Sequence, residues 1–455
     1  MSTQNQNEIF NTKTLVQNIF AGFTVSLLAL TLGAAFGILS GRGAFSGMLA
    51  AAIFALITSI FGGTRIQCSG PTAPMTTITA ILVAVSSSQI VSGNPDHFIN
   101  MAMFIGGIFM VLMGVFRLGK LIKYIPNVVI SGFMNGIAVL IWIDQFNRLF
   151  GVNSKTVIKG DLMTNIIIVT CTTALIFILP HYIKKYTGRF SSLLSSTLLT
   201  IVLMSLVTNI FSLNIEYIQL TETLTSWQDL QNLIINQWPS NWSFDFILLT
   251  IPFALQLAIL AYLDTLMTSL IVDKITKTKT KQNQELAAQG LANFTSGILG
   301  GIPGAQSTIH SVPIIKEKAT MRLAGIFVGI FVLVEILLFQ NLINLIPQAV
   351  FTGILFKVGY DVFDWRPLQL YVKEWITDKN TMMHDIFSRH DDKPIFVTHR
   401  EFFMIVGTTL TTIFINLNAA VGIFTALFYL HNLVFMRKKP LRDLKPMKET
   451  KPILA

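Results

Sequence analysis

Charged side chains are scarce in this sequence. They make up 12% of the 455 residues, whereas 52% of the residues are hydrophobic. An ordinary soluble domain carries about 25% charged residues, so the deficit excludes that class. Apolar stretches of about 20 residues recur from residue 15 to residue 436, and a helix needs about that length to cross a bilayer. The composition therefore indicates a polytopic membrane protein.

Cysteine and the usual catalytic motifs are also nearly absent. The two cysteines, Cys68 and Cys171, stand in different apolar stretches without metal-ligand spacing, so neither a disulfide nor a zinc site is predicted. The sequence has no P-loop, nucleophile elbow, HExxH motif or paired catalytic carboxylates. An enzyme is therefore not expected, and no organic cofactor is implied. The polar N-terminus lacks a cleavable signal pattern, so the first apolar segment should be retained.

Fourteen apolar segments can be recognised along the chain. Their ranges are 15–39, 45–61, 72–91, 98–117, 124–148, 162–180, 191–212, 247–271, 284–299, 306–316, 321–339, 345–360, 402–416 and 418–436. The polar stretch 362–400 is expected to be a cytoplasmic loop. The pattern predicts an all-α membrane protein with fourteen transmembrane segments, of which the third and tenth have broken starts.

Basic residues favour one side of this predicted topology. If the N-terminus is cytoplasmic, the even-numbered loops face the cytoplasm and should be basic. These loops hold Arg65, Lys120, Lys123, Lys184, Lys185, Arg189, Lys274, Lys277, Lys279, Lys281, Lys316, Lys318 and Arg322. One predicted outer loop is an exception, because it contains Arg148, Lys155 and Lys159. The distribution of basic residues as a whole still predicts an inner-membrane protein with both termini cytoplasmic. Because the excess charge of +10 flanks helix ends, no nucleic-acid partner is expected, and lipid is the natural surrounding.

A long outer linker divides the segments into two sets of seven. Residues 213–246 contain no Lys or Arg and are rich in Trp and amides, which is typical of an amphipathic interfacial stretch. The expected organisation is a first inverted repeat over 1–212, the linker over 213–246, a second repeat over 247–436 and a short basic cytoplasmic tail over 437–455. Inverted repeats with interrupted helices at matching places recur among secondary transporters.

The third and tenth segments open in a similar way. Residues 62–77 read GGTRIQCSGPTAPMTT and residues 300–314 read GGIPGAQSTIHSVPI, so both place prolines and small hydroxyl residues at the start of an apolar helix. If these helices begin inside the membrane, their free N–H groups need a partner, and the helix dipole favours an anion. The candidate anion-binding residues are Thr72, Ala73, Pro74, Ser307 and Thr308. The alternative is that prolines and glycines only kink two continuous helices.

Residues 62–77 resemble the third-helix region of the SulP family of inorganic anion permeases (solute carrier family 26). They are most similar to that region in the family's cyanobacterial sodium-dependent bicarbonate transporter branch. TLGAAFGILSG (31–41), AYLDTLMTSLIVD (261–273) and LGGIPGAQSTIHS (299–311) resemble the first, eighth and tenth helices. The resemblance covers nearly the whole chain. It implies two inverted seven-segment repeats that form a core (transport) domain and a gate domain, with half-helices at segments 3 and 10.

The resemblance also implies roles for individual residues. Leu32 and Phe36 correspond to first-helix side chains that line the anion pocket. Asp264 and Thr268 correspond to an acid and a threonine that bind sodium together with the start of the tenth helix, here Thr308. Residues at i and i+4 share one helix face, which agrees with a joint site for Asp264 and Thr268. Sodium is therefore the expected coupling ion.

Acids within membrane segments are costly and usually functional. Two alternatives remain open for Asp264: a hydrogen-bonded structural acid, or a carboxyl that carries a proton. Glu335 and Asp144 stand near the predicted outer ends of their helices and are expected at the membrane interface.

The sequence departs from the family pattern in two places. His310 stands where the family commonly has an arginine. Because an unperturbed histidine has a pKa of about 6.5, His310 is mostly neutral at pH 7 and supplies no permanent positive charge. It is a modulator of the site or a packing residue. The family usually carries a cytoplasmic STAS domain after the last helix, and this chain stops before one.

The favoured function is secondary transport of a small inorganic anion, bicarbonate or sulfate, by sodium-coupled symport. The alternatives are a proton-coupled dicarboxylate or nucleobase permease and an uncoupled anion channel, since a fold alone does not fix the substrate. The resemblance further implies a homodimer.

Overall fold

The computed structural model describes most of the chain. The described residues are 12–89, 95–152, 158–187, 196–218, 227–239, 242–377, 397, 399–415, 417–435 and 441. Within these ranges each of the fourteen predicted segments overlaps a helix, so the mostly helical class is confirmed. The predicted basic tail 437–455 lies outside the described residues, apart from Leu441.

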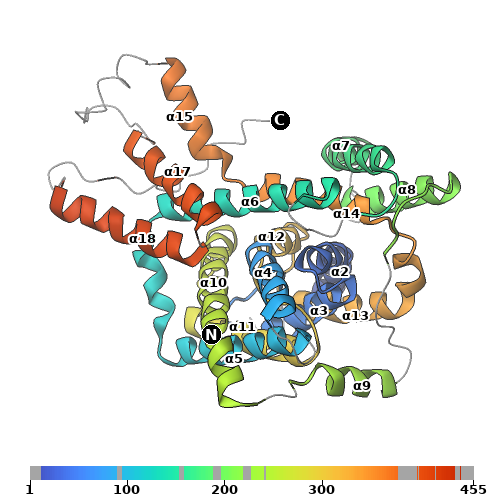
Figure 1. Ribbon diagram of the computed structural model, residues 1–455, viewed down its shortest axis with the longest axis horizontal. Coiled ribbons are helices and arrows are strands. Elements are labelled where there is room, and N and C mark those ends of the chain that lie inside the picture. Colours follow the sequence, from blue (N-terminus) through green and yellow to red (C-terminus); the bar gives the residue numbers. More distant parts are fainter. Residues whose placement is uncertain are drawn as a thin grey trace. The chain divides into compact units, whose positions relative to one another are not determined.

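The helices that overlap the predicted segments have the following bounds (Figure 1). They are α2 (Thr12–Ser40), α3 (Ala44–Phe61), α4 (Ala73–Gln89), α5 (Pro95–Val115), α6 (Asn127–Phe150), α7 (Leu162–Thr187), α8 (Ser196–Ile210), α10 (Phe244–Thr276), α11 (Gln282–Ile298), α12 (Thr308–Lys316), α13 (Leu323–Ile343), α14 (Gln348–Val362), α17 (His399–Phe414) and α18 (Leu417–Leu430). A 3₁₀ turn, Leu118–Tyr124, precedes α6, and a π-helical turn, His431–Phe435, follows α18.

Two further helices lie in stretches that were expected to connect segments. α9 (Trp227–Gln237) lies in the linker, and α15 (Trp365–Thr377) lies in the predicted cytoplasmic loop. The expectation of a loop throughout 362–400 is therefore wrong at α15. Its Leu368, Val372 and Ile376 recur every four residues and so share one helix face, and this short apolar stripe among charged residues makes α15 amphipathic.

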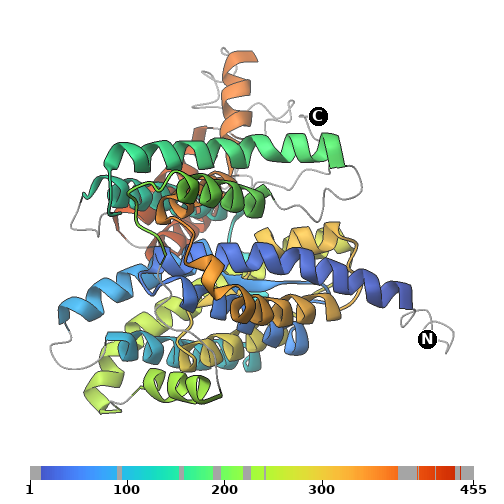
Figure 2. The same ribbon diagram turned by 90° about the vertical axis from the view of Figure 1, so that its right-hand side faces the viewer.

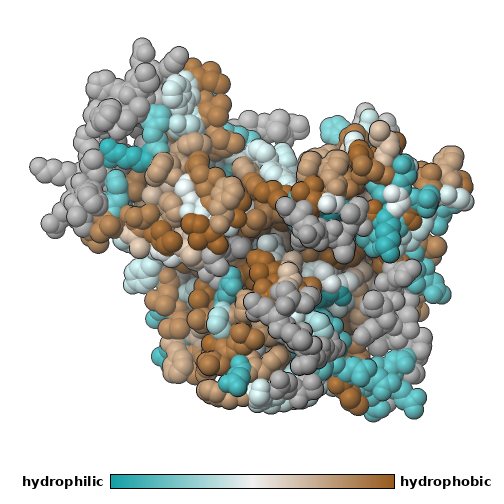
Figure 3. All heavy atoms as spheres, in the orientation of Figure 1, coloured by the Kyte–Doolittle hydropathy of each residue, from teal (hydrophilic) through white to brown (hydrophobic). Residues whose placement is uncertain are grey.

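Six helices of the described residues are long and apolar enough to cross a membrane: α2, α3, α5, α6, α7 and α10. Figure 3 shows wide hydrophobic areas on the visible face, and large apolar side chains such as Phe20 (56% exposed) and Ile210 (72%) contribute to the exposed surface. Exposed apolar area of this extent is unusual for a soluble monomer and suits contact with lipid. The described chain thus has the properties of a multi-pass membrane protein.

The chain forms two compact units. The first comprises Met1–Lys120 with Asp144–Lys357, and the second comprises Leu121–Ile143 with Val358–Ala455. The boundaries fall within the 3₁₀ turn Leu118–Tyr124, within α6 and within α14. The division into two compact units does not coincide with the predicted boundary between the inverted repeats at 213–246. That boundary stays a prediction.

Close helix packing in the first unit depends on small residues. α2 lies alongside α13 (Figure 2), and α5 packs along α11. A methyl group on Gly107 of α5 would lie 2.6 Å from the Gly290 carbonyl oxygen of α11. Glycine is therefore required where these helices approach, as is common between membrane helices. The tight packing of α11 matters because this helix holds the site described next.

Candidate anion and cation site

The third and tenth segments both begin with a short strand. β1 (Ser69–Pro71) precedes α4, and β2 (Gly304–Gln306) precedes α12. The strands pair antiparallel, with Gly70 opposite Ala305, and we call the pair the β1–β2 ribbon. The two helices therefore leave from opposite ends of the ribbon, and each contacts the strand that leads into the other. The alternative of two kinked continuous helices is wrong.

The two helices that leave the ribbon differ in length. α12 has 9 residues, which at 1.5 Å per residue is about 13 Å and far too short for a hydrocarbon core of about 30 Å. α4 has 17 residues, or about 25 Å, and is longer than the expected half-helix. Both nevertheless start at the ribbon, so their first N–H groups lie inside the protein.

Close contacts fix the ribbon. A methyl group on Gly304 would lie 2.5 Å from the Gly70 carbonyl oxygen, so only glycine fits there. Asn293 of α11 donates to the Gly304 carbonyl at 3.0 Å and accepts from its N–H at 3.2 Å. Ser311 of α12 donates to the Cys68 carbonyl at 3.0 Å and accepts from the Cys68 N–H at 3.1 Å. Neighbouring helices thus hold both strands in register.

A buried carboxylate anchors the chain that leads into β1. Oε2 of Glu285 accepts hydrogen bonds from the backbone N–H groups of Gly63 (2.8 Å) and Thr64 (2.9 Å) and from the amide of Gln67 (3.1 Å). Oε1 accepts from Gln289 at 2.9 Å, and Gln289 also donates to the Ser69 hydroxyl at 2.6 Å. Glu285 is not among the residues predicted from the sequence, and it positions the ribbon rather than facing a ligand.

The predicted anion-binding residues lie at the two helix starts. Thr72 caps α4, because its carbonyl accepts the Thr76 N–H at 2.9 Å. Ala73 and Pro74 are the first two residues of α4, where a missing N–H costs nothing. The remaining two candidates are Ser307, which is buried, and Thr308, which is half-buried.

Neither helix start is closed by its own side chains. Ser307 stands just before α12 but makes no side-chain cap bond to that helix. The Thr72 hydroxyl oxygen is buried and has no hydrogen-bond partner in the described part of the chain. The first amides therefore keep the partial positive charge of the helix dipole.

Leu32 and Phe36 lie on α2, which contacts β1, α4 and α12. Both side chains are buried, with 3% and 1% exposed. They therefore lie on the packing surface of the helix that flanks the ribbon, and their role in an anion pocket stays a prediction.

The acid and threonine that were predicted to bind a cation lie on α10, which contacts β2, α4 and α12. Asp264 interacts with the side chain of Thr72, yet Oδ2 of Asp264 and the Thr72 hydroxyl form no hydrogen bond of standard geometry and are both buried. Thr268 is buried one turn later. Thr265 receives a long hydrogen bond of 3.4 Å from the Gln306 N–H. The structure thus brings the acid to the start of α4.

His310 lies in the first turn of α12 and is 1% exposed. Both of its ring nitrogens lack a partner among the described residues, as does the side-chain oxygen of Gln306. A methyl group on Gly70 would lie 3.7 Å from Cε1 and Nδ1 of the ring, which places the imidazole against the ribbon. A neutral imidazole offers one donor and one acceptor, so it can serve a polar guest without a fixed charge.

Unpartnered buried polar atoms therefore gather around the ribbon from α10, α4, β2 and α12. Leaving such an atom unsatisfied costs about 1–3 kcal/mol, so several in one place indicate that a polar guest belongs there. No cluster of three His, Cys, Asp or Glu side chains occurs in the described ranges. The available cation ligands are a single carboxylate, hydroxyls and backbone carbonyls, and these hard oxygens fit sodium better than a transition metal.

A second buried acid lies away from the ribbon. Glu335 of α13 is 3% exposed and accepts a hydrogen bond from Ser26 of α2 at 2.5 Å. Glu335 is therefore buried within the protein on a helix that packs against α2 and α3, and its expected position at the membrane interface stays a prediction.

Arg42 secures the turn before β2, and it is not among the residues predicted from the sequence. The Arg42 side chain is 2% exposed and pairs with Asp96 at 3.4 Å. It donates to Asn100 at 2.7 Å and to the Gly301 carbonyl at 2.8 Å. In the sequence, only the position of Arg42 beside an apolar segment points to a structural role of this kind.

Residues 15–383 match the profile of the sulfate permease family. Among characterised proteins, the chain is 32% identical over 373 residues to the bicarbonate transporter BicA of Synechocystis sp., covering 78% of this chain and 62% of that protein. It is 30% identical over 372 residues to BicA of Picosynechococcus sp., covering 77% and 62%. The chain thus spans about 62% of the length of these relatives.

The fold is similar to a solved structure. The transmembrane domain of a cyanobacterium bicarbonate transporter BicA superposes with a TM-score of 0.72 at 26% identity, over 91% of this chain and 99% of that domain. The profile match over most of the chain leads to one conclusion: the protein belongs to the sulfate permease family.

Proposed function

We propose that the protein is a sodium-coupled symporter of a small inorganic anion, bicarbonate or sulfate. The observation that carries the proposal is the β1–β2 ribbon, from which two helices start with unpartnered polar atoms buried around them. The family description and the names of the bicarbonate-transporting relatives support the same substrate class.

The anion is proposed to bind between the starts of α4 and α12. Each helix end contributes about half a positive charge and free N–H donors. Thr72, Ser307 and Thr308 add hydroxyls at this position, and the small Ala73 allows a guest to approach the backbone. Leu32 and Phe36 supply the apolar side of the pocket, while His310 modulates it as a neutral hydrogen-bonding group.

Sodium coupling follows from the charge of Asp264. A carboxylate beside the start of α4 repels an incoming anion, because like charges at short range interact strongly in a low dielectric. A sodium ion held by Asp264 and Thr268, with Thr308 from α12, removes this repulsion and adds attraction. The two solutes then bind better together than apart, which is the thermodynamic basis of symport.

We further propose that the fourteen segments form two inverted repeats, and that a core domain moves against a gate domain to give alternating access. The protein is placed in the cell membrane with both termini cytoplasmic, and a homodimer is expected.

Proton coupling is the second candidate. The unpartnered Oδ2 of Asp264 would also be satisfied if the carboxyl carried a proton. In that case uptake follows the pH gradient and persists when sodium is replaced by an organic cation.

The test is uptake of labelled bicarbonate and labelled sulfate by proteoliposomes, with sodium or choline outside. For Asp264→Asn, the ratio of uptake with sodium to uptake without it should fall to about one, because the coupling energy between the two sites is lost. Asp361→Asn, which changes an exposed acid of α14, is the matched control and should keep the wild-type ratio. An Asp264→Asn protein with the wild-type sodium ratio would remove this residue from the mechanism.

A further inference from the structure

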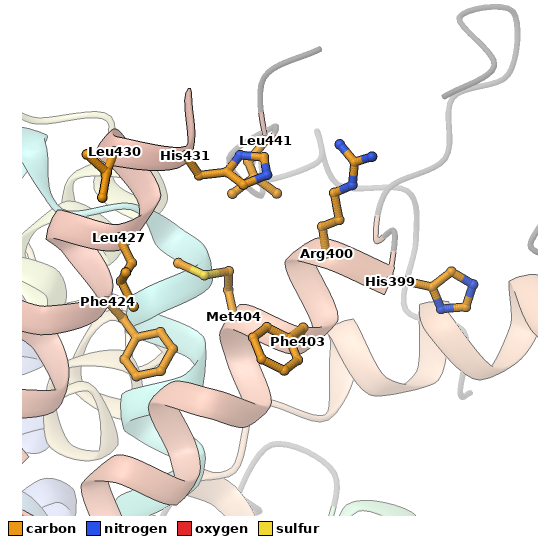
Figure 4. Close-up of a pocket in the computed structure, with 9 residues that line it drawn as sticks. All are labelled: His399, Arg400, Phe403, Met404, Phe424, Leu427, Leu430, His431 and Leu441. Atoms are coloured by element: carbon orange, nitrogen blue, oxygen red, sulfur yellow. The ribbon is translucent and has the colours of Figure 1, made fainter. Parts of the chain in front are cut away.

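The second compact unit contains a pocket of about 380 Å³ that the proposed transport site does not use (Figure 4). Its side chains come from the start of α17, the end of α18 and Leu441. The apolar residues that line it are Phe403, Met404, Phe424, Leu427, Leu430 and Leu441, and the polar ones are His399, Arg400 and His431. A volume of this size is typical of a small-molecule site, for which about 300–1,000 Å³ is usual.

The polar and apolar parts of the pocket are separated along the helices. Arg400 is the second residue of α17, and His431 directly follows α18, so both lie at helix ends. Phe403 and Met404 lie one turn further into α17, and Leu427 lies one turn before His431. Figure 4 shows Arg400 and His431 towards one end of the pocket and the rings of Phe403 and Phe424 towards the other. The basic side chains of Arg400 and His431 are therefore confined to one end of the pocket, where Leu430 and Leu441 also lie.

No acidic side chain is among the described residues that line the end of the pocket where Arg400 lies. His399 meets the Tyr371 hydroxyl of α15 through Nδ1 at 2.8 Å, which orients its ring. Glu401, which follows Arg400 in the sequence, is 1% exposed and already engaged in an interaction, so it does not face outward beside Arg400.

The apolar part of the pocket is open to the surroundings. Phe403 is 72% exposed and Leu427 is 42% exposed, whereas Met404 and Phe424 below them are 7% and 9% exposed. The backbone of Leu441 is held beside the pocket by Asn432, which accepts its N–H at 2.7 Å. An apolar groove that opens on an exposed apolar helix surface suits a hydrocarbon chain from the bilayer.

We propose that this pocket binds one molecule of an anionic phospholipid. The phosphate would lie at Arg400 and His431, because a guanidinium matches phosphate geometry with two parallel N–H donors. An acyl chain would lie along Phe403, Met404, Phe424 and Leu427. Charge at the helix ends together with hydrocarbon contacts one turn inward selects a lipid over a free anion, and basic pockets between membrane helices commonly hold such headgroups.

The test is native mass spectrometry of the full-length chain titrated with phosphatidylglycerol, with phosphatidylcholine of the same acyl chains, or with glycerol 3-phosphate. The proposal expects one tight phosphatidylglycerol adduct on the wild-type protein. Arg400→Gln should weaken it about fivefold, which corresponds to about 1 kcal/mol per basic residue near an anionic lipid. Leu427→Trp, which fills the apolar part, should weaken it as well. Arg366→Gln, at an exposed arginine of α15 outside the pocket, is the matched control and should leave it unchanged.

Three results would overturn the proposal. Equal retention of phosphatidylglycerol by Arg400→Gln, Leu427→Trp and wild type would show that the pocket is not the site. Equal binding of phosphatidylcholine would show that the pocket does not recognise the negative charge of the headgroup. Comparable binding of glycerol 3-phosphate would show a free-phosphate site instead of a lipid site. Thermal melts of both pocket variants establish that they are folded, so a loss of the adduct reports on the pocket.

Discussion

At the scale of single residues, the position of the β1–β2 ribbon depends on side chains outside the proposed binding site. Glu285 receives four hydrogen bonds, two of them from backbone N–H groups ahead of β1. Buried hydrogen bonds to a charged group contribute about 1.5–3 kcal/mol each. The position of the ribbon is therefore set partly by one carboxylate on α11.

Glu285→Gln should destabilise the protein by about 2–3 kcal/mol, because an amide NH₂ or a neutral oxygen replaces a charged acceptor facing N–H donors. The measurement is the thermal unfolding midpoint in detergent. Asp245→Asn, which changes an exposed acid at the start of α10, should shift the midpoint far less. Equal midpoints for Glu285→Gln and wild type would mean that these hydrogen bonds carry little of the stability.

Part of the candidate site could be predicted from the sequence. The polar residues of α11 that hold the ribbon also follow a recognisable pattern. The residues at the two helix starts follow from prolines and hydroxyls at broken helix entries. Glu285, Gln289 and Asn293 recur every four residues in an apolar segment, so they share one face of α11. That polar stripe indicates an internal partner, but its partner, the β1–β2 ribbon, is a tertiary feature that no local pattern specifies.

At the scale of elements, the β1–β2 ribbon decides where α4 and α12 start. Its register places Pro71 opposite Gly304. An added methyl group at Gly304 would collide with the Gly70 carbonyl. Because this carbonyl belongs to the backbone, it cannot rotate away as a flexible side chain could.

Gly304→Ala should therefore reduce anion uptake about tenfold or more, since overpacking of about 1–3 kcal/mol must be relieved by moving one strand. The matched control is Gly422→Ala in α18, where an added methyl group meets nothing within 4 Å. Both proteins should reach the membrane in similar amounts, as judged by fluorescence-detected gel filtration. Wild-type uptake by Gly304→Ala would show that the ribbon does not position the site.

Element boundaries were predictable wherever a run of apolar residues marks a segment. The stretch of α15 reads as a loop because charged and amide residues interrupt its apolar side chains, among them Leu368, Val372 and Ile376. A short amphipathic helix of this kind is stabilised by the surface against which it lies, and the sequence alone does not show that surface.

At the scale of the whole molecule, the basic loops predict the orientation in the membrane. Two exposed positions, Asn214 and Lys279, lie on opposite sides in this topology. In a Cys171→Ser background, Asn214→Cys should react with a membrane-impermeant maleimide in intact cells, while Lys279→Cys should react only after permeabilisation. Cys68 is buried and should stay silent. Labelling of Lys279→Cys in intact cells would reverse the topology.

The most direct test of the central claim is a structure determined with sodium selenate, a tetrahedral oxyanion whose selenium can be located by anomalous scattering, after selenate has been shown to compete for uptake. The account predicts a selenium peak between the starts of α4 and α12, with oxygens about 3 Å from the first backbone N–H groups of each helix. A competing selenate ion bound anywhere else in the chain would contradict it.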